Sequence, residues 1–160
     1  MCDCHDLGDY DDLFRDEDIL YRRVLEKHVA DGKVTTAHCQ TKQWKEGLSC
    51  DWSVIARPEE VAKGLPYLLT FTVGQCRTLD IHVRYCPHVD PHDPLYNLAH
   101  CLLVLPPQIK GRSEIARVRD RLLEVAILRA TEAEPEHKWQ MRIFNWIRAR
   151  FYSSARGGDS

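Results

Sequence analysis

Two apolar segments separated by a proline-rich stretch lie in the middle of the chain, and they constrain the fold most strongly. Residues 79–86 alternate between apolar and polar side chains, which is typical of a strand with one buried face. Residues 98–105 are apolar on both faces, as expected for a strand inside a covered sheet. Three prolines in residues 86–94 exclude regular secondary structure there. We therefore expect the two strands to lie side by side, joined by an exposed connection.

Local patterns predict further elements on either side of this centre. Apolar residues recur at helical spacing between Leu20 and His28, which favours a helix ending at Gly32, and an extended interpretation of residues 20–24 stays open. Strands are also predicted at 34–39, 49–55 and 67–73, with helices at 58–64, at 74–79 and from Ser113 onward. The chain is therefore predicted to be α+β, with a small sheet of about five short strands backed by helices on one face.

Charge is distributed unevenly along the 160 residues, although the formal net charge is only −2. Residues 1–18 contain eight acidic residues and one arginine, whereas residues 138–160 contain five basic residues and one aspartate. We predict an acidic mobile N-terminus (1–18), an α+β domain (19–130), a linker (131–137), a basic amphipathic helix (138–152) and a disordered tail (153–160). The near-neutral centre argues against a nucleic-acid partner, because phosphate neutralisation supplies much of the affinity for nucleic acid.

The seven cysteines are odd in number and include no pair at the two-residue spacing of zinc knuckles and redox motifs. The N-terminus lacks the basic and then apolar profile of a signal peptide. No transmembrane segment is expected, because the longest apolar stretch, 65–73, is far shorter than the ~20 residues of a membrane-spanning helix. These features predict a cytoplasmic protein with reduced thiols, most of them buried as small hydrophobic groups.

Histidines, cysteines and acidic residues gather in residues 82–101. Zinc binds thiolate and imidazole in a tetrahedral shell, and Cys86, His88 and His92 supply three such ligands. His100 would close the site. The spacing matches no established zinc motif, so the alternative is a solvated loop, stiffened by prolines, whose histidines bind no metal. Zinc is the candidate cofactor, and the sequence leaves the cofactor otherwise open.

His100 is also a candidate catalytic base at the start of the second apolar strand. Asn97 and Asp93 are near it in the sequence and would orient its ring. The alternative is a structural histidine that holds the loop. Cys101 is not expected to pair with His100, because adjacent residues of a strand point to opposite faces, and it is predicted to be a core thiol.

A basic amphipathic helix is predicted near the C-terminus, where aromatic and aliphatic residues recur at helical spacing among arginines. Such a helix packs on its own domain, docks in a groove of another protein or lies on a membrane surface. Tryptophan and arginine dominate interface hot spots, which favours a protein partner. The predicted partner-binding residues are Trp139, Arg142, Ile143, Trp146, Ile147 and Arg150.

Five short motifs in this chain resemble a group of small bacterial proteins with no known activity. The motifs are Leu20-Tyr21-Arg22-Arg23-Val24, Leu48-Ser49-Cys50-Asp51-Trp52, Pro58-Glu59-Glu60, Gly74-Gln75-Cys76-Arg77-Thr78-Leu79 and Asn97-Leu98-Ala99-His100. The resemblance covers residues 19–128 approximately. It implies that this part is one domain, and that Asn97 and His100 belong to its shared pattern.

A weaker likeness is to ADP-ribosyltransferases, which place an early strand arginine, a serine or threonine strand and a late glutamate around NAD. The glutamates of this chain fall on a predicted helix, which departs from that pattern. The residues concerned are Arg22, Arg23, Ser49, Ser53, Glu114 and Glu124.

Two functions are therefore expected. The first is a non-enzymatic protein–protein interaction or accessory module of a bacterial multi-protein system, which binds through its charged ends. The alternative is a small hydrolase or transferase that depends on histidine and cysteine, with or without zinc, and is centred on residues 82–101.

Overall fold

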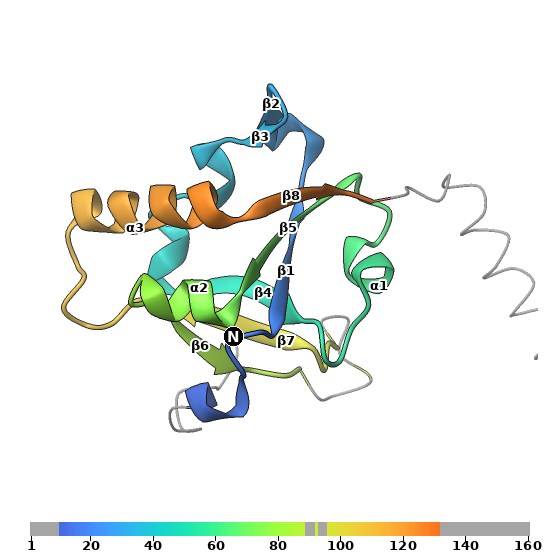
Figure 1. The fold of residues 1–160 in the computed structure, drawn as a ribbon, viewed down its shortest axis with the longest axis horizontal. Coiled ribbons are helices and arrows are strands. Elements are labelled where there is room, and N and C mark those ends of the chain that lie inside the picture. The colour runs from blue at the N-terminus through green and yellow to red at the C-terminus, as the bar shows by residue number, and fades with distance from the viewer. Residues whose placement is uncertain (1–9, 89–91, 93–95, 132–160) are drawn as a thin grey trace, which may run out of the picture.

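The computed structural model describes residues 10–88, 92 and 96–131 (Figure 1). Its strands are β1 (Ile19–Val24), β2 (Val29–Ala30), β3 (Lys33–Val34), β4 (Leu48–Trp52), β5 (Tyr67–Thr72), β6 (His82–Tyr85), β7 (His100–Val104) and β8 (Ile127–Ala130). Its α-helices are α1 (Pro58–Ala62), α2 (Val73–Thr78) and α3 (Arg112–Val125). Short 3-10 helices are η2 (Tyr10–Leu13), η3 (Glu26–His28), η4 (Thr36–Cys39) and η5 (Gln43–Lys45).

Six strands form one antiparallel sheet in the order β6-β7-β4-β1-β5-β8, and β2 and β3 form a separate hairpin. The α+β class is therefore confirmed for the described residues. The predicted pairing in the middle of the chain is also confirmed, because Val83 of β6 lies opposite Leu103 of β7 and Tyr85 lies opposite Cys101. The proline-rich connection thus joins two neighbouring strands.

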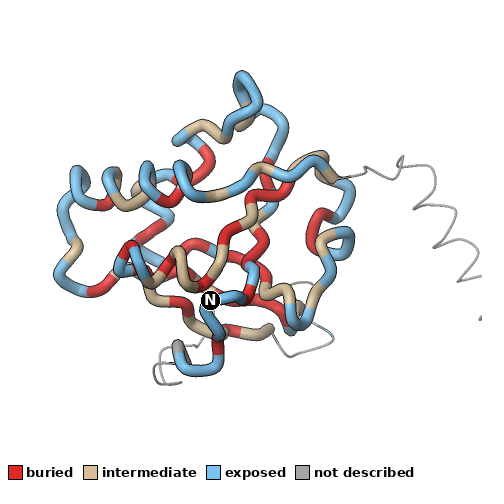
Figure 2. The backbone as a smooth tube through the Cα atoms, in the orientation of Figure 1, coloured by how far each residue is buried: buried red, intermediate tan, exposed pale blue. Residues whose placement is uncertain are grey.

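Both faces of the sheet are covered by helices, so the expectation of helices on one face only is wrong. The face that we call the core face packs against α2, α3 and the 3-10 helices η4 and η5 (Figure 2). Its fully buried side chains include Leu20, Cys50, Leu69, Leu103 and Leu122. On the opposite face, which we call the outer face, α1 covers a smaller cluster of Tyr21, Val61, Ala62 and Leu68.

β1 is a strand, although the spacing of its apolar residues favoured a helix. Leu20 and Val24 belong to the core cluster, whereas Tyr21 belongs to the cluster under α1. Side chains four residues apart share one face in a helix and also in a strand, so this spacing alone does not separate the two. The ladder with β5 continues through six paired positions and fixes the extended conformation. The alternative extended interpretation of residues 20–24 is therefore the right one.

Two further differences concern short elements. The predicted strand at 34–39 is only the end of β3 followed by η4. β8 was not predicted, and it raises the sheet above the expected five strands. The predicted helices at 58–64 and 74–79 correspond to α1 and α2, and Gln75 closes a capping box with Thr72 at the start of α2.

The folded part of the chain begins before residue 19, inside the segment (1–18) that was predicted to be mobile. Phe14 is buried in the core, and the Trp52 indole donates a hydrogen bond to the Asp18 carboxylate at 3.1 Å. Gly74 permits this segment to approach α2, because a Cβ at that position would lie 3.1 Å from the backbone oxygen of Asp16. The predicted C-terminal helix (138–152) and tail (153–160) lie outside the described residues.

Cys39, Cys50, Cys76 and Cys101 are buried and are not disulfide-bonded, as predicted. Cys86 is disulfide-bonded, so the prediction of reduced thiols is wrong for this cysteine. In the part of the chain that the structure describes, no helix has the length and apolar character needed to cross a membrane.

Candidate functional site

A serine and a histidine form a hydrogen-bonded pair on the outer face of the sheet. Asp51 of β4 lies opposite His100 of β7, and Ser49 lies two residues further along β4, so both β4 side chains share this face with His100. Ser49 Oγ is 2.8 Å from His100 Nε2. His100 is buried, whereas Ser49 is exposed, so the hydroxyl is the accessible member of the pair.

The other ring nitrogen of His100 fixes the tautomer. Nδ1 lies 2.7 Å from the backbone oxygen of Cys86, and a carbonyl only accepts hydrogen bonds, so Nδ1 carries the hydrogen. In the neutral ring Nε2 is then the acceptor for the Ser49 hydroxyl. Pairing of β6 with β7 brings this carbonyl into place, because the Cys86 amide itself donates to the His100 carbonyl at 3.0 Å.

Burial keeps His100 in the neutral form. Desolvation lowers its pKa below the ordinary 6.5, and the nearby charges of His88 and Arg23 act in the same direction. The Cys86 carbonyl and the Asp51 carboxylate oppose this shift, since both favour the protonated ring. The ring is therefore unprotonated at neutral pH, which is the state that a general base requires.

The Asn97 side chain contacts the Asp51 carboxylate and not the His100 ring, although it was predicted to orient that ring. Its side-chain amide donates to the Asp51 carboxylate, which is buried, and its side-chain oxygen accepts a hydrogen bond from the Ala99 amide at 3.0 Å. Asn97 also pairs with His88 through an isolated antiparallel bridge. The His88 ring consequently stacks at a tilt against His100, with ring centroids 4.7 Å apart.

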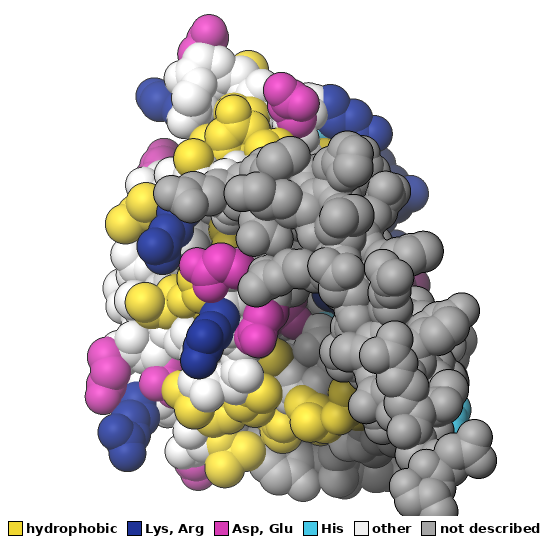
Figure 3. Space-filling model, turned by 90° about the vertical axis from the view of Figure 1, so that its right-hand side faces the viewer, with side chains coloured by type: hydrophobic (Ala, Val, Ile, Leu, Met, Phe, Trp, Pro, Cys, Tyr) yellow, Lys and Arg dark blue, Asp and Glu magenta, His cyan; other side chains and the backbone are white. Residues whose placement is uncertain are grey.

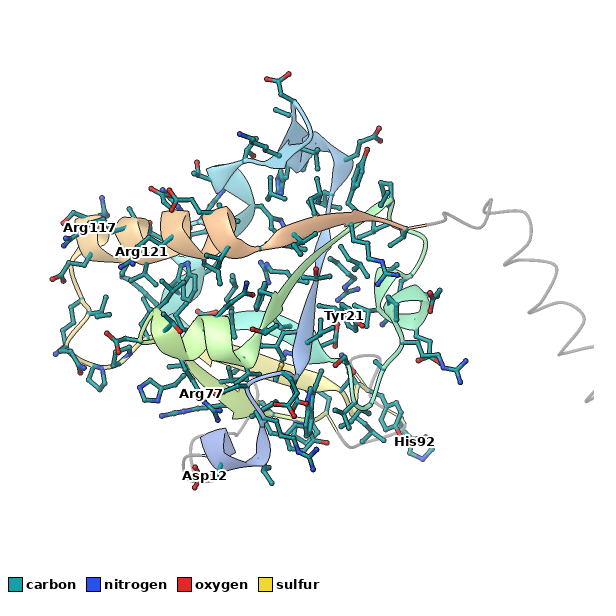
Figure 4. All side chains as sticks on the ribbon, viewed as in Figure 1. Asp12, Tyr21, Arg77, His92, Arg117 and Arg121 are labelled. Carbon is teal, nitrogen blue, oxygen red and sulfur yellow. The ribbon has the colours of Figure 1, made fainter. Side chains whose placement is uncertain are left out.

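The predicted metal ligands do not converge. Cys86 is disulfide-bonded, so its sulfur is not a thiolate, and His92 is exposed at the rim of the molecule (Figure 4). Within residues 10–88, 92 and 96–131, no three histidine, cysteine or acidic side chains are placed to hold a metal ion. Asp93 lies outside the described residues. The zinc hypothesis therefore gains no support from this geometry.

A second polar group reaches the same strand from the core face. The Arg22 guanidinium donates to the Ser49 backbone oxygen at 2.6 Å and to His38 Nε2 at 3.1 Å. Arginine only donates, so His38 carries its hydrogen on Nδ1, which faces Nδ1 of His28 at 3.2 Å. Burial, together with the charges of Arg22 and His28, lowers the pKa of His38 to about 4.

The remaining candidates lie on the core face. Cys101 lies opposite Cys50 in the ladder, and burial raises the pKa of both thiols, so Cys101 is an inert core thiol as predicted. Glu114 and Glu124 belong to α3, which packs on the core face and is separated from Ser49 by the sheet. The grouping expected from the likeness to ADP-ribosyltransferases is therefore not formed.

The side of the molecule that α1 occupies shows no continuous basic surface among its described atoms. Acidic, basic and hydrophobic side chains are interspersed there (Figure 3). On α3, which Figure 4 labels at Arg117 and Arg121, both of these arginines are exposed. The expectation that the partner is not a nucleic acid stays a prediction.

Comparisons with protein-family models, with curated proteins and with solved structures give no match. The site therefore rests on its own geometry. Sequence analysis identified His100 but assigned no role to its partner Ser49 outside the likeness to ADP-ribosyltransferases. The polar alternation of residues 49–53 was the available signal, since it puts Ser49, Asp51 and Ser53 on one face of a strand.

Proposed function

We propose that the protein is a small hydrolase or acyltransferase in which Ser49 is the nucleophile and His100 is the general base. The observation that carries the proposal is the hydrogen bond from Ser49 to a histidine whose second nitrogen is fixed by a backbone carbonyl. A nucleophile, a base within hydrogen-bond reach and a group that orients the base form the constellation that activates a serine. Ser49 replaces the cysteine expected in the alternative reading of the sequence.

In the first step His100 Nε2 takes the hydroxyl proton while Ser49 Oγ attacks the substrate carbonyl carbon. The tetrahedral intermediate collapses to an acyl-serine, and the leaving alcohol takes the proton from Nε2. In the second step Nε2 removes a proton from water, whose oxygen attacks the acyl carbon. The Ser49 oxygen leaves and regains the proton, and a carboxylic acid is released. A second alcohol in place of water gives acyl transfer.

The groups around His100 support both of its protonation states. The Cys86 carbonyl accepts from Nδ1 throughout, so the ring does not rotate when Nε2 gains a proton. The Asp51 carboxylate favours the protonated ring, and Asn97 holds that carboxylate in place. Because the unprotonated ring is the resting state at neutral pH, Asp51 acts mainly when charge develops during the reaction.

The test is hydrolysis of p-nitrophenyl acetate by the full chain, with Ser49→Ala and His100→Gln as variants. Each is expected to lose at least about 100-fold in kcat/KM, because a positioned base contributes about that much. Ser113→Ala, an exposed serine on α3, is the matched control and should keep the wild-type rate. A fluorophosphonate probe should add covalently to Ser49, as located by peptide mass spectrometry. Full activity of Ser49→Ala, or labelling elsewhere, contradicts the proposal.

Other expectations remain predictions. The interaction function and its bacterial multi-protein system depend on residues 138–152, outside the described chain, so no contact supports them. Four buried cysteines without a disulfide favour a cytoplasmic location, whereas the Cys86 disulfide is typical of an oxidising compartment.

A further inference from the structure

Arg23 lies on the same face of the sheet as the proposed nucleophile. Tyr21 of β1 is paired with Asp51 of β4, and two residues further along each strand come Arg23 and Ser49. Side chains at alternate positions share a face, so Arg23 and Ser49 both belong to the outer face. On its other side Arg23 is paired with Leu68 of β5.

The Arg23 guanidinium is exposed and makes no hydrogen bond or ion pair with any residue in the described part of the chain. Its neighbour Arg22 differs, because it is hydrogen-bonded to Ser49 and His38. The charge of Arg23 nevertheless reaches the Ser49–His100 pair, since it contributes to lowering the pKa of His100. Arg23 is therefore a cation near the proposed reaction centre, with its guanidinium accessible to a ligand.

We infer that the substrate is an ester whose acyl chain ends in a carboxylate, and that Arg23 binds this carboxylate. The inference rests on the proposed function. A guanidinium offers two parallel donors that match the two oxygens of a carboxylate. A single negative charge suits the site better than a phosphate dianion, because Arg23 is one cation and Asp51 is an anion on the same face. Arg23 and Ser49 each lie two residues beyond the Tyr21–Asp51 pair, where β1 and β4 are no longer paired, so the acyl chain spans the gap between these two strands.

The test compares two esters with the same leaving group, p-nitrophenyl hemisuccinate with its terminal carboxylate and the neutral p-nitrophenyl acetate. Arg23→Gln should raise KM for the hemisuccinate at least about tenfold and leave KM for the acetate within about twofold, because a hydrogen bond to a charged group is worth about that factor. Arg129→Gln is the matched control, because exposed Arg129 lies opposite Leu68 on the far side of β5. It should change neither KM. Succinate should inhibit competitively, and inorganic phosphate at the same ionic strength should not.

Equal effects of Arg23→Gln on both esters, or stronger inhibition by phosphate than by succinate, overturn this inference and leave the Ser49 mechanism standing. Hydrolysis of both esters by Ser49→Ala at the wild-type rate overturns the proposed function instead. The two failures are therefore distinguishable in one set of assays.

Discussion

Two buried histidines of this protein have lowered pKa values with different consequences. His100 faces an exposed hydroxyl, so its neutral ring is available as a base. His38 faces Arg22 and His28, and every contact that it makes stays inside the fold. Its burial therefore contributes to stability and not to chemistry at the surface. The dependence of folding on pH should identify His38.

We predict that His38 makes the protein less stable as the pH falls from 6.5 to 4. The unfolded histidine takes up a proton near pH 6.5, whereas the folded one does so only at about 4, so acid favours the unfolded chain. The stabilising contribution is complete above pH 6.5, and its loss amounts to at most about 3 kcal/mol at low pH. His38→Gln, whose side-chain oxygen can still accept from Arg22, should flatten the dependence measured by urea unfolding at pH 7, 5.5 and 4. The same slope in both proteins would contradict this account.

At the scale of elements, the contact between β1 and β4 is incomplete. The two strands pair only at Leu20 with Trp52 and at Tyr21 with Asp51, whereas β1 pairs with β5 along its whole length. Beyond Tyr21 the Arg22 guanidinium supplies the hydrogen bond to the Ser49 backbone oxygen. A side chain thus replaces a ladder hydrogen bond at the residue that carries the proposed nucleophile.

We predict that Arg22→Met lowers the free energy of unfolding by about 1–3 kcal/mol, because it leaves the Ser49 oxygen and His38 Nε2 without their donor. Arg23→Met on the same strand is the control and should cost less than about 0.5 kcal/mol, since its side chain is exposed. Urea unfolding at pH 7 measures both changes. Equal stability of the two variants would show that the Arg22 contacts contribute nothing to the fold.

Elements that carry their own local signals could be predicted from the sequence. α1 has Pro58 at its start and Gly64 after its end, and β6 and β7 are marked by alternation and by a dense apolar run. β8 has no such signal, because Ala126 alone separates it from α3 and its conformation depends on pairing with β5. Short strands of this kind are fixed by tertiary contacts, which a local pattern does not contain.

The site could be predicted only in part for the same reason. His100 was recognised from its place beside the apolar strand. Its partner Ser49 is 51 positions away in the chain, and only the register of β4 against β7 brings the two together. A shift of that register by one residue would turn Ser49 to the core face, so the pair is a property of strand alignment rather than of any motif.

At the scale of the whole molecule, the segment before β1 connects strand β4 to helix α2. The Phe14 ring packs against Trp52 of β4 with centroids 4.6 Å apart. The Arg77 side chain of α2 donates to the Phe14 backbone oxygen at 3.0 Å and pairs with the Asp16 carboxylate. Side-chain and backbone contacts therefore attach residues 14–18 to both β4 and α2, and the folded unit should depend on them.

We predict that Phe14→Ala lowers the free energy of unfolding by about 3–5 kcal/mol, because it removes a ring that is only 3% exposed from the core. Leu13→Ala is the matched control, since Leu13 is 51% exposed, and it should cost less than about 1 kcal/mol. Guanidinium unfolding followed by tryptophan fluorescence measures both, and Trp52 reports directly on the site of the change. If the two variants are equally stable, residues 10–18 are an appendage, and the folded domain begins at β1 as the charge distribution suggested.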